Sequence, residues 1–96
     1  MVTLEGNEVF AYEEIMLALG KMGEESLGGV ADLPSFSLSS LTNYISDELR
    51  RRLGTKDKVI HYMEREGIIA KEGILHRATP KFYEELEKVK HKEMMI

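Results

Sequence analysis

The chain has 96 residues, of which 43% are hydrophobic and 31% charged, a composition typical of one soluble globular domain with a single core. The absence of cysteine excludes disulfides and thiolate metal sites, and no apolar run approaches the roughly 18 residues that a membrane span requires. The N-terminus lacks the features of a signal peptide, so the expected location is cytoplasmic. Abundant Glu and Lys with no glutamine is a bias typical of a thermophile.

The net charge of −4 is unevenly distributed along the chain. Residues 1–49 contain nine acidic residues and one basic residue, a balance of −8, whereas residues 50–96 contain twelve basic and eight acidic residues, a balance of +4. Because contact with phosphate depends on local basic patches rather than on total charge, the second half is the expected side for a nucleic acid. The acidic first half is expected either to contact a protein partner or to keep the chain soluble.

The first predicted element is a helix over residues 8–22. Its apolar face follows the 3.6-residue period and consists of Val9, Tyr12, Ile15, Met16, Leu19 and Met22. Phe10 and Leu17 fall on a second face, and a small domain with a helix that is apolar on two sides predicts a partner element or a second subunit. Residues 23–37 contain two adjacent glycines and a proline and are predicted to form a long loop.

A second helix is predicted over residues 38–53, with Ser37 or Ser39 as its N-cap. Its buried stripe consists of Leu38, Leu41, Ile45, Leu49 and Leu53. Gly54 is expected to end this helix. Near its end, Arg50 and Arg51 lie off the apolar stripe, where they can reach phosphate or interact favourably with the helix dipole.

A third helix is predicted over residues 55–66, with Thr55 as its N-cap and Gly67 as its terminator. The short break before it has the length of the turn in a helix-turn-helix. At about 100° per residue, one side of this helix carries Val59, Ile60 and Met63. The opposite side carries Lys58, His61, Tyr62 and Arg65, a set that suits contact with base edges in the major groove of DNA. The alternative is an ordinary solvated helix face. Thr55 and Lys56 are expected to hold phosphates.

A β-hairpin is predicted over residues 68–78, with Glu72-Gly73 as a two-residue turn. This register pairs Ile69 with His76 and directs Ile68, Ala70 and Leu75 towards the core. The candidate contacts to DNA on the hairpin are Lys71, His76 and Arg77. Thr79 as N-cap and Pro80 as first residue then open a last helix over residues 80–93.

No residue pattern predicts catalysis, a metal or a cofactor. The three histidines are too scattered for a recognisable zinc spacing, and no glycine-rich phosphate loop is present. No serine or carboxylate constellation suits a hydrolase, so an enzyme is not expected.

The segment over residues 45–86 resembles the winged helix-turn-helix superfamily, and in particular small bacterial and archaeal repressors of the MarR and PadR type. The residues that carry the resemblance are VIHYMEREGII in the third helix and TPKFYEEL after the hairpin. The resemblance implies one domain over residues 1–96, mainly α with a small β-hairpin. It further implies that the third helix is a recognition helix, that the hairpin is a wing, and that the terminal helices form a homodimer. The expected dimer contacts are Phe10, Leu17, Val89 and Met94.

The favoured hypothesis is a homodimeric, sequence-specific transcriptional regulator that binds double-stranded DNA. A second hypothesis is a DNA-binding adaptor in plasmid partition, viral function or replication, which spreads on DNA or recruits a protein through its acidic half. A third is a winged helix used only for contact between proteins, which the overall negative charge favours.

Overall fold

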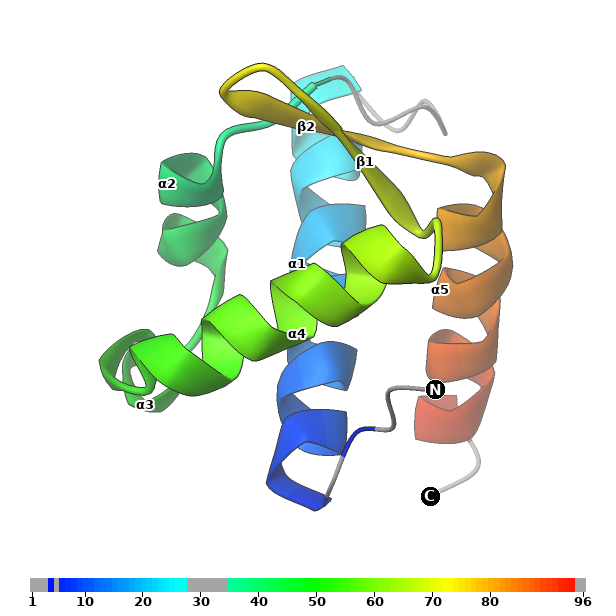
Figure 1. Ribbon diagram of the computed structural model, residues 1–96. Helices are drawn as coiled ribbons and strands as arrows, with labels where there is room; N and C mark the ends of the chain where they lie inside the picture. The colour runs from blue at the N-terminus through cyan, green and yellow to red at the C-terminus, as the bar shows by residue number, and fades with distance from the viewer. Residues whose placement is uncertain (1–3, 5, 28–34, 95–96) are drawn as a thin grey trace.

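The computed structural model describes residues 4, 6–27 and 35–94, which form a mainly helical domain with one two-stranded antiparallel hairpin. The elements in chain order are α1 (Gly6–Leu27), α2 (Leu38–Leu41), the 3-10 helix η1 (Thr42–Tyr44), α3 (Asp47–Arg51), α4 (Leu53–Arg65), β1 (Ile69–Glu72), β2 (Leu75–Ala78) and α5 (Pro80–Met94). In Figure 1, α1 runs through the middle of the molecule, α4 crosses in front of it, α5 lies on one side, and α2 and α3 lie on the other.

Helix α1 forms the centre of the core, and Ile15, Met16 and Leu19 are completely buried. It is longer than the predicted residues 8–22 and continues through part of the expected loop to Leu27. Residues 28–34 of that loop lie outside the described residues. Gly20 faces α5 so closely that an added Cβ would lie 3.1 Å from the Leu86 side chain. Both apolar sides of α1 are therefore largely used within the chain, by α4 and α5.

The single helix predicted over residues 38–53 is wrong. Ser37 caps α2 as expected, but the chain becomes extended at Ile45, and Ser46 starts a new helix by accepting a hydrogen bond from the Leu49 backbone N–H. Ser46 is followed by two acidic residues that favour a helix N-terminus, and its own N–H donates to the Glu14 carboxylate. The predicted apolar stripe is nevertheless buried, since Leu41, Ile45 and Leu49 are all in the core although the helix is interrupted between them. The side chain of Leu53 lies outside the described part of the chain.

The junction before α4 also differs from the prediction. Only Arg52 separates α3 from α4, so Gly54 lies in the first turn of α4 instead of ending a helix, and Thr55 is a helical residue instead of a cap. The other end of α4 agrees with the prediction. Gly67 has φ +73°, and the backbone N–H of Ile68 donates to the Met63 carbonyl oxygen at 2.9 Å, which closes the helix.

The hairpin forms between the expected residues but in another register. Glu72 pairs with Leu75, so the turn is Gly73-Ile74 rather than Glu72-Gly73. The reason is that Gly73 has φ +65°, the conformation that a tight hairpin turn requires at its first central position. Ile69 and His76 share one side of the hairpin in either register, and this side, rather than the side of Ala70 and Leu75, turns towards the core. His76 is therefore buried, and Leu75, which was expected in the core, is exposed.

Candidate nucleic-acid interface

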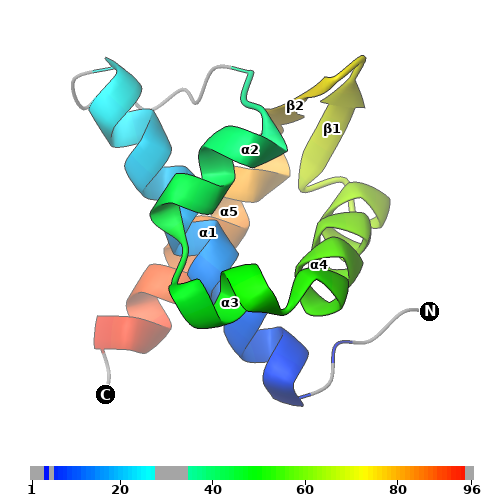
Figure 2. The same ribbon diagram turned by 90° about the vertical axis from the view of Figure 1, so that its left-hand side faces the viewer.

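Helix α4 lies on the outside of the domain with one side buried and one side in solvent. Val59, Ile60 and Met63 are buried in the core, as the 3.6-residue period predicts. The exposed side carries Asp57, Lys58, His61 and Arg65. Figure 2, viewed from the side of α2 and α3, shows that α4 and the hairpin project on the same side of the molecule.

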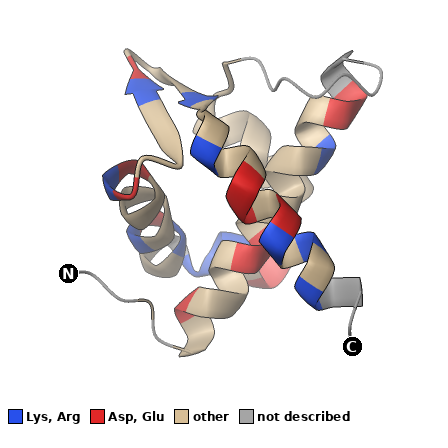
Figure 3. Cartoon of the chain, turned by 90° about the vertical axis from the view of Figure 1, so that its right-hand side faces the viewer, with Lys and Arg blue, Asp and Glu red and all other residues tan. Residues whose placement is uncertain are grey.

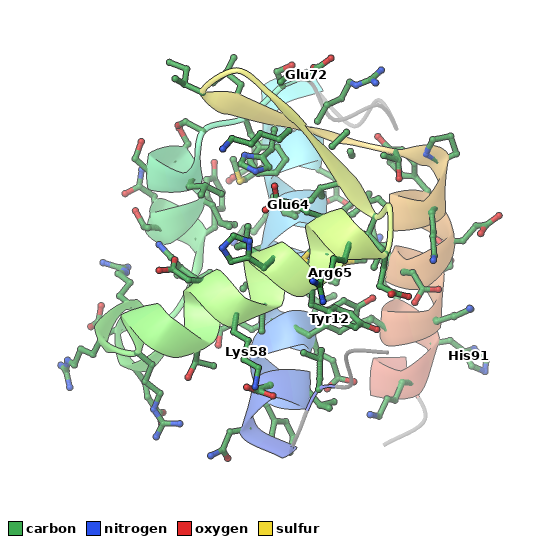
Figure 4. The ribbon with its side chains drawn as sticks, in the orientation of Figure 1. Tyr12, Lys58, Glu64, Arg65, Glu72 and His91 are labelled. Carbon is green, nitrogen blue, oxygen red and sulfur yellow. The ribbon has the colours of Figure 1, made fainter. Side chains whose placement is uncertain are left out.

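Not all four residues of the predicted groove-facing set lie on this exposed side. Tyr62 is half-buried, with its ring edge-on to that of Tyr12 at 5.8 Å, and burial raises the pKa of its hydroxyl. Lys58 is exposed, but its ammonium lies 2.7 Å from the Glu8 carboxylate of α1. Figure 4 shows Lys58 pointing towards the first turns of α1. His61 and Arg65 remain the members of the set that face solvent without a link to α1.

The arginines that end α3 differ in their partners. Arg50 lies 3.4 Å from Asp47 and donates to the Ile45 carbonyl oxygen at 3.2 Å, while Arg52 lies 2.9 Å from Glu48. Arg51 is exposed. Thr55 is partly buried and Lys56 is 8% exposed, so little of either side chain is available for the expected phosphate contact.

Of the three residues predicted to contact DNA from the hairpin, one is exposed and has no ion pair among the described residues. Lys71 is exposed, and Arg77 is exposed but lies 3.6 Å from the Glu72 carboxylate. The prediction that His76 is exposed beside Lys71 is wrong, because its ring is buried and stacked on that of Phe36 at 5.9 Å. Its backbone N–H and C=O also pair with Phe36, which extends the hairpin by one isolated bridge.

Ion pairs neutralise much of the basic second half of the sequence. The lysines of α5 lie within 4 Å of carboxylates, and two of these carboxylates belong to α1: Lys92 pairs with Glu13 at 2.9 Å and Lys90 with Glu24 at 3.9 Å. Figure 3 shows the resulting mixture of acidic and basic residues on the side that α5 forms. The charge split along the sequence therefore does not become two separately charged halves in space.

Three exposed basic residues of the candidate interface have no ion pair among residues 4, 6–27 and 35–94. These free cations are Arg51 at the end of α3, Arg65 at the end of α4 and Lys71 on β1. Lys71 lies beside α4, where it lines the same hollow as His61. This set, and not the full list of twelve basic residues, is what the surface offers to phosphate.

Two hollows adjoin α4. The larger, about 320 Å³, lies between the start of α1 and α3, and its lining includes Phe10, Glu14 and Glu48. The smaller, about 160 Å³, lies between α4, α2 and the hairpin, and its lining includes His61, Glu64 and His76. Sequence reasoning missed this second grouping; the spacing of His61 and Glu64 on one helix was a signal for half of it.

The predicted dimer contacts are only partly exposed. Phe10 is 74% exposed, Leu17 is partly buried against the core, and Val89 is buried inside the domain and is not available to a second subunit. The side chain of Met94 lies outside the description. An exposed phenylalanine beside the larger hollow is therefore what remains of the predicted interface.

Comparison with models of known protein families, with curated protein sequences and with solved structures returned no match. No helix in the described ranges combines the length and the apolar character that crossing a membrane would require.

Proposed function

We propose that this protein binds double-stranded DNA by laying α4 against the major groove, as a winged helix-turn-helix regulator would. The observation that carries the proposal is the outward side of α4, where His61 and Arg65 face solvent. The free cation Lys71 lies beside this helix on the hairpin, and Arg51 ends the preceding helix α3. A helix of 13 residues is about 20 Å long, and the major groove of DNA admits such a helix.

Each part of this surface has a distinct task in the proposal. Arg65 suits a paired contact with a guanine edge, and His61 can donate or accept a hydrogen bond at a neighbouring base. Arg51 and Lys71 suit phosphates on either side of the groove, which set affinity and salt dependence rather than sequence choice. Asp57 lies on the same exposed side and disfavours phosphate, so contact close to the start of α4 is expected to be weak.

The experiment is a selection from a pool of random duplexes, followed by a titration of the enriched duplex at fixed salt. Lys71→Ala is compared with Lys21→Ala, which removes the same charge from an exposed position on α1. Only Lys71→Ala should weaken binding. If both variants lowered the affinity for the duplex equally, the binding would depend on net charge alone and not on the hairpin. If the selection enriched no duplex, the proposal would be wrong.

In the same proposal the protein is a cytoplasmic homodimer that regulates transcription, with Phe10 at the contact between subunits. Two-fold symmetry would place two copies of α4 on half-sites about one DNA turn apart. Cooperative spreading along long DNA in a footprinting assay would instead indicate an adaptor in partition, viral function or replication.

A second candidate function is contact with another protein alone. It is favoured by Phe10, which is exposed beside a hollow whose lining includes Glu14 and Glu48. Two results together would support this function over DNA binding. The wild-type protein would be a monomer that binds no duplex at low salt, and a protein partner would bind the wild type but not the Phe10→Ser variant.

A further inference from the structure

Strand β1 has one side on which a backbone amide and carbonyl lack a partner. In an antiparallel pair the N–H and C=O of one residue point to the same side of the strand, and this side alternates from each residue to the next. His76 bonds through both of these groups to Phe36 at 2.8 Å, so its backbone faces away from β1. Lys71 lies opposite His76 in the register, so its own N–H and C=O face away from β2.

These two groups of Lys71 are open to a further strand. No backbone hydrogen bond outside the hairpin involves Lys71 among residues 4, 6–27 and 35–94, and the residue is exposed. The sheet therefore has the order Phe36, β2, β1, and β1 is its open edge. Figure 2 shows β1 on the outside of the hairpin, away from α2. An exposed strand edge is a template for pairing with another extended segment.

The edge is open only towards the turn of the hairpin. Ile69 is the other residue of β1 whose backbone faces outwards, but it is 1% exposed and is covered by the domain. Beyond Lys71 the tip of the hairpin carries Ile74, which is 91% exposed, and Leu75, which is 37% exposed. An added strand therefore bonds at Lys71 and meets an apolar hairpin tip.

Charge decides which strand fits this edge. Arg77 and Glu72 lie 3.6 Å apart, so Lys71 is the cation of the hairpin that has no ion pair in the described part of the chain. A second copy would have to pair about Lys71, because Ile69 is covered, and this would bring two lysines directly opposite each other. Like charges in that position are destabilising, whereas opposite charges stabilise a cross-strand pair. The edge therefore opposes self-pairing and favours an acidic partner.

We propose that β1 accepts an extended acidic segment of a partner protein as an added antiparallel strand. The N–H and C=O of Lys71 bond to the backbone of the segment, and the ammonium pairs with a carboxylate on the residue opposite. The proposal goes beyond DNA binding, because its contacts and its test need no nucleic acid. A segment bound in this way covers Lys71 and competes with phosphate for it.

The test is a titration of the full ¹⁵N-labelled chain with capped peptides of alternating threonine and valine that differ in one central residue. With glutamate at the centre, the Lys71 amide signal should shift and its exchange with solvent should slow, because a hydrogen bond forms there. With lysine at the centre, the affinity should be about two- to fivefold lower at low salt. The glutamate peptide with an N-methylated central amide keeps its charge but loses a donor, so it should bind more weakly than its parent.

A charge reversal in the protein gives the matched comparison. Lys71→Glu should bind the lysine peptide more tightly than the glutamate peptide. Lys21→Glu, the same change at an exposed position on α1, should keep the wild-type order. A Lys71 amide that does not respond, or equal affinity for the methylated and parent peptides, would overturn the proposal. A Lys71 signal that moves with protein concentration in the absence of peptide would identify a second copy as the occupant and overturn it as well.

Discussion

Two glycines, one in the first turn of α4 and one just after its end, should respond in opposite ways to substitution by alanine. Gly67 has φ +73°, and an added Cβ would meet nothing within 4 Å, so Gly67→Ala is opposed by conformation alone. Forcing an alanine into the left-handed region costs about 1–2 kcal/mol. Gly54 also has open space around it but lies in the first turn of α4, where alanine is favoured over glycine by up to about 1 kcal/mol.

Urea unfolding followed by circular dichroism measures both effects. With an m-value of about 1.5 kcal/mol/M, Gly67→Ala should lower the midpoint by roughly 1 M, and Gly54→Ala should raise it by a few tenths of 1 M. The slopes should stay unchanged, since neither variant alters the buried surface. If both variants were destabilised alike, Gly54 would be a helix terminator as the sequence suggests, and the start of α4 at Leu53 would be wrong.

Three further predictions concern charge, pH and capping. If each of the three free cations contacts one phosphate, the logarithm of DNA affinity falls with slope of about −2.7 per chain against log salt, roughly a 40-fold loss between 50 and 200 mM. An alanine triple variant should be nearly insensitive to salt, and an unchanged slope would contradict the contacts. Burial, and next the Glu85 carboxylate, raise the pKa of Tyr12, so stability is full below a pH of about 10 and is lost as pH rises. Unfolding at pH of about 9 and 11 should show a smaller loss for Tyr12→Phe than for wild type, and equal losses would refute this cause. Ser46→Ala should cost about 1 kcal/mol of unfolding free energy because it removes the cap of α3, whereas Ser39→Ala should cost less.

The parts of the fold that follow from local pattern were predictable from the sequence. The inner side of α4 obeys the helical period, and Gly67 ends the helix because only glycine adopts its conformation at no cost. The break at Ser46 escaped detection because Ile45 and Leu49 keep a four-residue spacing across it, which imitates one continuous helix. The hairpin register depended on which turn position Gly73 occupies. The sides of His76 and Leu75 were assigned wrongly for another reason, since the alternation of residues does not reveal which side of the hairpin packs on the core.

The candidate site was harder to predict because it depends on contacts between distant residues. The pairs Lys58 with Glu8 and Lys92 with Glu13 link α1 to α4 and to α5, which are distant in the sequence, so no local pattern predicts them. These lysines belong to the basic half of the sequence that was expected to contact DNA, but in the structure they form ion pairs within the domain. The grouping of His76 with Glu64 required the hairpin register as well as the direction in which α4 crosses the domain.

The most direct test of DNA binding through α4 is a backbone amide spectrum of the ¹⁵N-labelled protein, recorded at low salt with and without a duplex. Non-specific phosphate contacts suffice for this measurement, so the cognate sequence is not needed. The amide signals of His61, Arg65 and Lys71 should shift most, and the shifts should vanish at high salt. Shifts confined to the α1 surface around Phe10, or no shift at any salt concentration, would contradict the proposed function.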